Sequence, residues 1–216
     1  MADSLARKAA TPMRVLVACE FSGVVREAFR RKGHDAWSCD LMPAKDSSPY
    51  HIQGDVLDWL HGPLMPESEW DLMIAHPPCT YISNMSNCRI NQPGRAQLRR
   101  AGMEFFRKLA DAHIPRKAVE NPRGLPEREY RKPDQIIQPW MFGHAASKAT
   151  CLWLTNLPKL KGTCEVAPER KWDGKRWRTW VDRLPSSSPR RSVTFQGIAD
   201  AMADQWGAER ILCQTK

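Results

Sequence analysis

The sequence predicts an α/β fold, with a mostly parallel, doubly wound sheet that carries helices on both faces. Two continuous apolar runs, Val15 to Cys19 and Leu72 to Ala75, have the character of strands covered on both sides. Strand-like and helix-like segments alternate along the first half of the chain, which is the order that builds parallel sheets. Several predicted strands end in a carboxylate, a glycine or a cysteine, so we expect these groups to share one cleft beyond the strand ends.

The first predicted unit is a strand, a turn and a helix. Val15 to Cys19 forms the strand, Glu20 to Gly23 the turn, and Val24 to Lys32 an amphipathic helix that Gly33 ends. The expected inner face of this helix holds Val25, Ala28 and Phe29, and the expected outer face holds Arg26, Arg30 and Arg31.

Further elements follow in the same alternation. The predicted strands are Ala36–Asp40, Ile52–Asp55, Asp71–Ala75 and Lys117–Pro122. The predicted helices are Val56–Leu60 and Arg95–Ala112. The longer helix has a basic outer face and carries, at helical spacing, Leu98, Met103, Phe106 and Leu109.

Composition limits the classes of function. The chain has 216 residues, enough for one domain or one domain with a small appendage. Lys and Arg outnumber Asp and Glu by 33 to 24, and the net charge of +9 favours a polyanionic partner, with nucleic acid first. Seven scattered cysteines fit neither a disulfide framework nor a metal site, so we expect reduced thiols in a cytoplasmic protein. No apolar stretch approaches the roughly 20 residues that span a bilayer, and no membrane role is expected.

A cysteine follows one predicted strand after a stiff turn. Pro77 and Pro78 restrict the backbone and end the strand, which directs Cys79 into the expected cleft. The last predicted strand brings Glu120 to the same edge, and a carboxyl group beside a thiol is an acid paired with a nucleophile. The alternatives are that Cys79 is a small core residue and that Glu120 pairs with an arginine.

The ends of the first predicted strands suit an adenosine. Gly23 at the start of a helix lets a ligand approach the backbone, and Asp40 lies 17 residues further on, where a carboxylate suits a ribose diol. The phosphate-binding pattern Gly-x-Gly-x-x-Gly is absent, which indicates a nucleoside without phosphates, and S-adenosylmethionine is the candidate cofactor. The alternative is a set of ordinary turn residues and solvated carboxylates.

From Val15 to Gly207 these motifs resemble those of DNA (cytosine-5)-methyltransferases, in a compact form similar to phage- and prophage-encoded members. The similar segments are Cys19-Glu-Phe-Ser-Gly23, His76-Pro-Pro-Cys79, Glu120-Asn121, Phe142 to Thr150 and Gln196-Gly-Ile-Ala199, with Asp40 and Asp55 at the acidic positions of the family. The chain departs from the family pattern at Cys19, which replaces an aspartate, at Ala146, which replaces a glutamine, and at Lys148 and Thr150, which replace two arginines.

The resemblance implies a Rossmann-like S-adenosylmethionine-dependent methyltransferase fold and methyl transfer to C5 of cytosine in DNA. It implies Cys79 as the nucleophile that adds to C6, Glu120 as a group that works protonated or shares a proton with N3, and Lys148 as a third catalytic residue. The target base lies inside the stack of the duplex, so the resemblance implies that the enzyme binds double-stranded DNA and flips the base out. We expect the protein to be a monomer. The implied cofactor-binding residues are Glu20, Phe21, Ser22, Gly23, Asp40, Leu41, Asp55, Val56, His76, Pro77, Gln196 and Gly197.

The resemblance also divides the chain. A flexible start (1–12) precedes the methyltransferase core (13–157), a small basic Trp-rich insertion (158–192) and a C-terminal helix that returns to the core (193–216). The insertion is far smaller than the usual target-recognition domain, so we expect short or relaxed sequence specificity.

Two segments are expected to contact DNA. Lys171 to Trp180 is expected to form a hairpin around Asp173 and Gly174, with tryptophans that either stack on DNA or pack on the main domain. The polar loop Ser83 to Arg95 is expected to close over the flipped base. The predicted DNA-binding residues are Ser83, Asn84, Arg89, Lys171, Lys175, Arg176, Trp177 and Arg178.

Three alternatives stay open. An amino-methylating enzyme usually has Asp, Asn or Ser before the two prolines and an aromatic residue after them, whereas His76 and Cys79 stand there in this chain. A non-enzymatic viral DNA-binding or decoy protein of the same fold would bind DNA without forming a covalent adduct. The changes at Lys148 and Thr150 leave room for a variant enzyme that acts on nucleotides or uses a modified cofactor.

Overall fold

A computed structural model describes residues 11–61, 70–175, 177–179, 184–185 and 191–208. Most of the predicted flexible start, the DNA-binding candidate Arg176 and the hairpin residue Trp180 lie outside the described residues. Within the described ranges, no helix is both long enough and apolar enough to pass through a bilayer.

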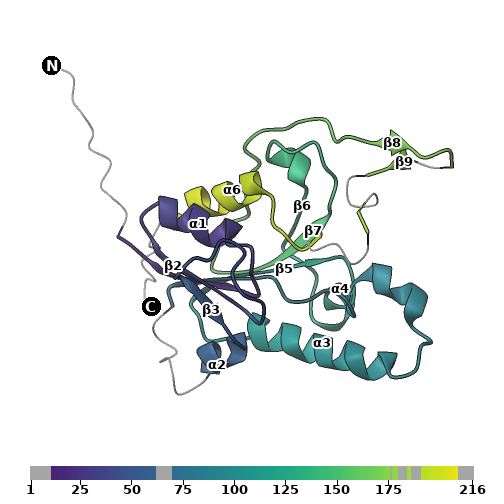
Figure 1. Ribbon diagram of the computed structural model, residues 1–216, viewed down its shortest axis with the longest axis horizontal. Helices are drawn as coiled ribbons and strands as arrows, with labels where there is room; N and C mark the ends of the chain where they lie inside the picture. The colour runs from purple at the N-terminus through teal and green to yellow at the C-terminus, as the bar shows by residue number, and fades with distance from the viewer. Residues whose placement is uncertain (1–10, 62–69, 176, 180–183, 186–190, 209–216) are drawn as a thin grey trace.

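A seven-stranded sheet forms the centre of the molecule (Figure 1). Its strand order is β3-β2-β1-β4-β5-β7-β6, and every strand runs in the same direction except β7, which is antiparallel to both neighbours. The predicted class, an α/β fold with a mostly parallel sheet, is confirmed. The strands are β1 (Arg14–Ala18), β2 (Asp35–Asp40), β3 (His51–Gln53), β4 (Leu72–Ala75), β5 (Arg116–Pro122), β6 (Gln135–Ile137) and β7 (Thr150–Thr155).

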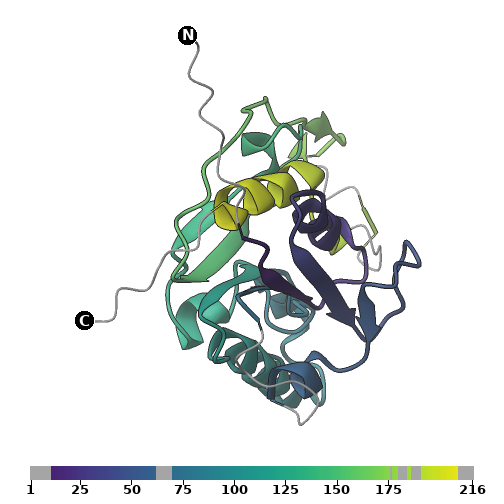
Figure 2. The same ribbon diagram turned by 90° about the vertical axis from the view of Figure 1, so that its left-hand side faces the viewer.

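Helices cover both faces of the sheet (Figures 1 and 2). One face carries α1 (Val24–Arg31) and α6 (Gln196–Gly207), which pack on each other. The other face carries α2 (Val56–His61), α3 (Arg95–Ala110) and α4 (Pro126–Glu129). Two short 3-10 helices, η2 (Asn84–Arg89) and η3 (Pro139–Met141), connect these elements.

The central strands divide their side chains between two cores. Val15 and Val17 of β1 pack in the cluster that contains Trp206 of α6, whereas Leu16 packs in the cluster that contains Phe106 of α3. Successive side chains of a strand point to opposite faces, so a strand that is covered on both sides has to be apolar at every position. This requirement explains the continuous apolar runs of β1 and β4.

Arg26 corrects the prediction for α1. The amphipathic pattern placed Arg26 on the outer face of the helix, but its side chain is fully buried. It donates to Ser38 Oγ at 2.8 Å and pairs with Glu27 at 2.9 Å and with Asp46 from the loop that follows β2. The loop covers this part of α1, and the carboxylates and the hydroxyl satisfy the guanidinium donors that burial removes from water.

The segment between Cys79 and α3 also differs from the prediction. Much of the expected polar loop forms η2, in which the buried Ser86 donates to the carbonyl of Ser83 at 2.6 Å. Arg99 of α3 donates to Asn87 at 3.1 Å and holds η2 against α3. Leu98, expected in the core, is 43% exposed because the first turns of α3 extend beyond the strands of the sheet (Figure 1).

The predicted hairpin is present as a two-stranded sheet, β8 (Lys171–Trp172) and β9 (Trp177–Arg178), in which Trp172 lies opposite Trp177. Asp173 accepts a hydrogen bond from the backbone of Lys175 at 2.9 Å and shapes the turn. Trp172 and Trp177 are 56% and 62% exposed, and their rings touch each other at a centroid distance of 5.7 Å. These two tryptophans therefore leave most of their surface free for a partner.

Candidate active site

The turn after β4 holds Cys79 at the carboxyl end of the sheet. The backbone of His76 donates to the carbonyl of Ala18 in β1 at 2.9 Å, which continues the strand pairing by one residue. The side chain of the buried Asn121 donates to the carbonyl of Pro77 at 2.9 Å and fastens the turn to β5. Cys79 follows two residues later and is exposed.

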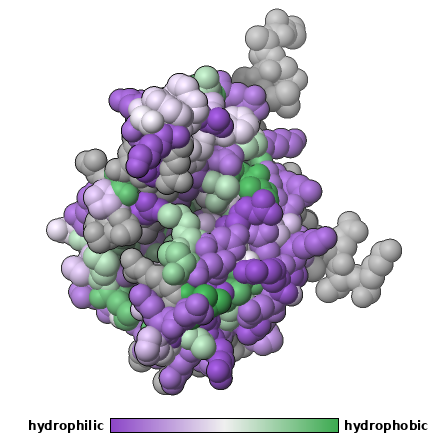
Figure 3. Space-filling model, turned by 90° about the vertical axis from the view of Figure 1, so that its right-hand side faces the viewer, coloured by the Kyte–Doolittle hydropathy of each residue, from purple (hydrophilic) through white to green (hydrophobic). Residues whose placement is uncertain are grey.

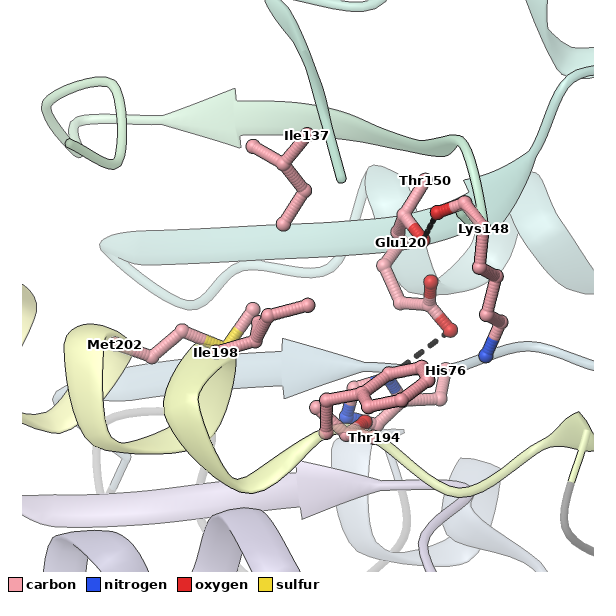
Figure 4. A pocket seen from close by; sticks show the side chains of 9 residues that line it. His76, Glu120, Ile137, Lys148, Thr150, Thr194, Ile198 and Met202 are labelled. Carbon is pink, nitrogen blue, oxygen red and sulfur yellow. Dashed lines mark hydrogen bonds and ion pairs between the residues drawn. The ribbon is translucent and has the colours of Figure 1, made fainter. Parts of the chain in front are cut away.

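Glu120 lies near the carboxyl end of β5, between β4 and β7. Its side chain is 16% exposed, and its Oε1 lies 3.2 Å from Nδ1 of His76, whose side chain is 6% exposed. Figure 4 shows the ammonium group of Lys148 beside this pair. The structure therefore brings the predicted residues Glu120, His76 and Lys148 together.

A narrow pocket lies next to these side chains. Its walls come from β5, β6, β7 and the start of α6, and Thr194 and Phe195 contribute to it. The free space is about 10 Å³, which is room for about one water molecule. A pyrimidine ring would therefore require the pocket to widen.

The surroundings shift two pKa values in this region. Burial raises the pKa of Glu120, but the hydrogen bond and charge of His76 and the charge of Lys148 outweigh burial, so the pKa lies below its ordinary value. Glu120 is thus ionised near neutral pH, whereas the role that the family resemblance implies for it at N3 requires a proton on it or shared with it. Desolvation of the thiol and the charge of Glu120 raise the pKa of Cys79, and Lys148 and Arg191 counteract part of this rise.

The first three strands bring a second group of predicted residues together. Asp40 ends β2, and Asp55 lies two residues after β3. Both carboxylates help to raise the pKa of Cys19, which directly follows β1, after the larger effect of burial. Leu41, next to Asp40, is 73% exposed. Two carboxylates beside an exposed apolar side chain fit the hydroxyl groups, amino group and base of an adenosine.

A side chain of the protein occupies the position at the N-terminus of α1 where an anion could bind. Gly23 adopts φ +73° and turns the chain into the helix. The buried carboxylate of Glu20 accepts hydrogen bonds from the backbone of Val25 at 2.7 Å and of Arg26 at 3.2 Å. These first-turn amides would otherwise bind an anion such as a phosphate. Their use by Glu20 agrees with a nucleoside ligand that lacks phosphates.

The other cofactor candidates lie in different surroundings. Phe21 and Ser22 are half-buried in the turn before α1, and Val56 is buried in the core. The backbone of Gly197 donates to Nε2 of His144 at 2.9 Å. Gln196 is exposed and bonds to Asp200 at 2.9 Å, along α6. Gln196 therefore makes its contact along α6, and Gly197 makes its contact with His144.

The predicted DNA-binding residues form two groups. On the hairpin, Lys171 pairs with Glu169 at 3.4 Å, Arg178 pairs with Asp173, and Lys175 is exposed. In the second group, Asn84 is exposed, Arg89 lies in η2, and Ser83 is buried by its backbone contact with Gly124. The face that carries the hairpin is mostly hydrophilic (Figure 3).

A hollow of about 610 Å³ lies between η3, the segment 165–170 and Thr179. Gln138 and Ser147 line it, and the side chain of Gln138 accepts a hydrogen bond from the backbone of Lys148 at 2.9 Å. Gln138 lines the hollow and Lys148 lines the pocket that contains Glu120, so this hydrogen bond links the walls of the two cavities.

Sequence reasoning missed some members of the site. It did not pair His76 with Glu120, and it did not assign the buried Asn121 a contact with Pro77. It also left out Thr194, which precedes the recognised Gln196 motif and lines the pocket. The Glu120-Asn121 motif could have indicated Asn121. No local pattern indicates the contact of His76 with Glu120 or the place of Thr194 in the pocket, because both bring together distant parts of the chain.

Comparison with known proteins adds independent information. No family model matches the chain. A curated viral protein, "Probable DNA (cytosine-5)-methyltransferase" of Frog virus 3 (isolate Goorha), is 29% identical over 179 residues, which cover 73% of this chain and 81% of the relative. This chain is similar to a viral DNA (cytosine-5)-methyltransferase. The resemblance inferred from the motifs is thereby confirmed.

A solved structure also matches the chain. It is described as a DNA modification methyltransferase encoded within an E. coli prophage, and the match has a TM-score of 0.45 and 17% identity. The match covers 66% of this chain and 46% of the other, so this chain spans about half the length of that protein.

Proposed function

We propose that this protein is a DNA (cytosine-5)-methyltransferase that works through a covalent bond between Cys79 and C6 of the target cytosine. The observation that carries the proposal is the position of Cys79 and Glu120 at the carboxyl ends of the neighbouring strands β4 and β5, with Lys148 beside Glu120. The similarity to the viral relative supports it.

Cys79 would act as the nucleophile. Its thiolate adds to C6, and the electron pair of the C5–C6 double bond moves toward C5, which becomes able to attack an electrophilic methyl group. Because the pKa of the thiol is raised, the thiol has to lose its proton as the bond to C6 forms. Loss of the C5 proton and of Cys79 then restores the aromatic ring.

Glu120 would control the charge at N3. When the thiolate adds to C6, negative charge reaches N3, and a carboxylic acid that donates a proton there stabilises the adduct. Lys148 would contribute a positive charge next to Glu120 and Cys79. A lysine supplies this charge as a compact ammonium group rather than as a planar guanidinium fork.

The ends of β1, β2 and β3 would hold S-adenosylmethionine. Asp40 and Asp55 suit the hydroxyl and amino groups of its adenosine, and Leu41 suits the base. In the sheet order, β1 lies between β2 and β4, so the turn from Phe21 to Gly23 lies between these carboxylates and the turn that carries Cys79. When bound, S-adenosylmethionine supplies an electrophilic methyl group.

Double-stranded DNA would lie against the face with the hairpin. Trp172 and Trp177 offer exposed rings for stacking, and Lys175 offers a positive charge for a phosphate. The insertion 158–192 would act as a reduced target-recognition element on the core 13–157, with short or relaxed sequence specificity. The pocket beside Glu120 would widen to admit a cytosine that has been flipped out of the duplex.

The test is the identity of the modified nucleoside. Unmethylated duplex DNA is incubated with S-adenosylmethionine and either the wild-type protein or Cys79→Ala, then digested and analysed by mass spectrometry against authentic methylated nucleosides. We expect 5-methylcytosine from the wild type alone. N4-methylcytosine or N6-methyladenine would overturn the proposal, because the amino-methylating alternative would then be correct.

The same assay addresses the remaining alternatives. DNA binding without any product at any cytosine would overturn the proposal in favour of a DNA-binding or decoy protein. Product from cytidine nucleotides but not from DNA would indicate the nucleotide-modifying variant. A C5 adduct heavier than methyl, formed with cell extract but not with pure S-adenosylmethionine, would indicate a modified cofactor.

A further inference from the structure

The contact between His76 and Glu120 has no part in the mechanism so far. The two side chains come from neighbouring strands, with Nδ1 of His76 3.2 Å from Oε1 of Glu120, and both are largely withdrawn from solvent. Within the described part of the chain, neither ring nitrogen of His76 meets the geometry of a hydrogen bond, so its approach to Glu120 is a close polar contact. Glu120 is the polar group that lies next to Nδ1 of His76 (Figure 4).

The other groups around this pair are mostly neutral. Ile137 from β6, Thr150 from β7, and Thr194 and Ile198 at the start of α6 line the same pocket. Lys148, next to β7, is the cation that faces Glu120. Further toward the opening of the site, Cys79 interacts with Glu120, Lys148 and Arg191. Among the described residues, these are the titratable and charged groups that act on the pair.

This arrangement leaves a question about one proton. N3 of neutral cytosine is a hydrogen-bond acceptor, so an ionised Glu120 would repel it and could not neutralise the charge that reaches N3. The pKa of Glu120 is lowered, so Glu120 does not carry the necessary proton in the free protein. A neighbouring group has to supply it.

We propose that His76 is a positioning residue that holds the proton which Glu120 donates to N3 of the target cytosine. This inference rests on the proposed function. The proton moves from Nδ1 of the imidazolium to the carboxylate, which leaves neutral His76 and neutral Glu120. As the bond between the sulfur of Cys79 and C6 forms, the proton moves on to N3, and it returns by the same route when Cys79 leaves. The pair therefore consumes no proton in a full cycle.

Histidine suits this task better than the nearby lysine. An ordinary imidazole exchanges its proton near neutral pH, whereas an ordinary lysine ammonium holds its proton up to about pH 10. In the proposed roles, Lys148 contributes a positive charge beside Glu120, and His76 contributes the proton that is transferred. The buried position of His76 behind Glu120 also keeps this proton from direct exchange with bulk water.

The test uses exchange of the C5 hydrogen of cytosine with solvent, measured without S-adenosylmethionine. Addition of Cys79 to C6 lets C5 take up a solvent proton. Loss of the original C5 proton and then of Cys79 releases the exchanged base. For the wild type we expect a bell-shaped dependence on pH, because a thiolate and a proton on the His76–Glu120 pair are both required. For His76→Gln we expect exchange to be about 10²-fold slower near neutral pH. We also expect the alkaline limb of its pH profile to shift to lower pH, because Glu120 alone must then hold the proton.

Thr194→Val is the matched control, since Thr194 lines the same pocket without a titratable group. It is expected to change the rate without changing the shape of the pH profile. If His76→Gln lowers the rate by the same factor at every pH, or leaves it unchanged, His76 is structural and the inference is wrong. If the wild type shows neither exchange nor methylation, the proposed function fails first and the inference fails with it.

A second measurement does not depend on the His76 variant folding. The protonation of His76 is followed by NMR in the wild type and in Glu120→Gln. We expect His76 in Glu120→Gln to lose its proton at a lower pH, because the neighbouring carboxylate that favours the imidazolium is gone. An unchanged titration of His76 would overturn the inference.

Discussion

Glu120 and Cys79 need opposite protonation states within one small site. In the proposed mechanism, the thiol loses its proton as it bonds to C6, and the carboxylate has to gain a proton before it can donate one to N3. Lys148 lowers both pKa values, so it assists the nucleophile and opposes protonation of the carboxylate. The site therefore needs a separate proton source for Glu120, which is the role we propose for His76.

Glu120→Gln should separate chemistry from binding. Gln keeps the shape of the side chain and the close contact with His76 but cannot donate an acidic proton, so we expect methylation to fall by about 10²- to 10⁴-fold. Binding of S-adenosylmethionine, measured by calorimetry, should change little because the proposed cofactor residues lie at β1, β2 and β3. Near-normal methylation by this variant would contradict the assigned role.

At the residue scale, local motifs indicated the groups that we propose to be reactive but not their partners. Cys79 could be identified from two prolines and the end of an apolar run, and Glu120 from the end of another strand. The contact between His76 and Glu120 crosses from β4 to β5 over 44 positions of sequence, so no local pattern indicates it. Arg26 was misplaced because helix periodicity treats an arginine as a solvent-facing residue and does not register a later loop that covers it.

At the scale of elements, the loop after β2 is held against α1 by Asp46. This carboxylate pairs with the fully buried guanidinium of Arg26. The backbone of Lys45 also donates to the carbonyl of Phe21 at 2.9 Å, in the turn where the cofactor is proposed to bind. The loop thereby contributes to both the stability of α1 and the shape of that turn.

Asp46→Ala should destabilise the protein by about 1–3 kcal/mol, because it removes a charged hydrogen-bond partner from a buried arginine that retains Glu27 and Ser38. The matched control is Asp200→Ala, which breaks the exposed pair with Arg31 and should cost about 0–1 kcal/mol. Urea unfolding of both variants measures the difference. An equal loss of unfolding free energy in both variants would show that the pair with the buried arginine stabilises the protein no more than the exposed pair does.

Gly124 should be required for the segment that follows Cys79. A Cβ at this position would overlap the carbonyl oxygen of Ile82 and the backbone of Ser83, so Gly124→Ala has to displace them. We expect a loss of about 1–3 kcal/mol in stability together with reduced methylation.

Gly33→Ala is the control for Gly124→Ala. Gly33 has φ +85° and open space around it, so alanine there should cost about 1–2 kcal/mol in backbone strain without changing activity. Thermal unfolding and methylation rates are compared for the two variants. Full activity in Gly124→Ala would contradict the proposed link between this glycine and the Cys79 turn.

At the scale of elements, the sequence predicted β1 to β5, the main helices and the hairpin, because each has its own apolar period or turn residues. It did not predict β6 and β7. It did not predict η2, since Asn84 to Arg89 has no apolar period and is held by hydrogen bonds to Ser83 and Arg99. The antiparallel direction of β7 was likewise not evident from the composition of its strand.

At the scale of the whole molecule, the net charge of the chain and the exposed rings of the hairpin both favour a nucleic-acid partner. The chain carries a net charge of +9, and the hairpin presents two tryptophans that are more than half exposed. A basic surface with aromatic rings binds phosphates and stacks on bases, so affinity for DNA should fall with added salt.

The double variant Trp172→Ala, Trp177→Ala should bind duplex DNA more weakly by about 1–3 kcal/mol for each base that stacks on a ring. Its stability should change little because both side chains are mostly exposed. Ile136→Ala, at an exposed apolar residue on β6, is the matched control and should bind normally. Fluorescence anisotropy measures binding, and unchanged affinity of the double variant would exclude the hairpin from the DNA interface.

The central claim is that the sulfur of Cys79 bonds to C6 of a cytosine in DNA. The direct measurement is a covalent complex with duplex DNA that contains 5-fluorocytosine, in the presence of S-adenosylmethionine, since fluorine at C5 prevents the final loss of a proton. The account predicts a denaturant-resistant complex with the wild type, with the DNA attached at Cys79 by peptide mass spectrometry, and none with Cys79→Ala. A wild-type protein that binds both ligands but forms no complex, or a complex that survives in Cys79→Ala, would contradict it.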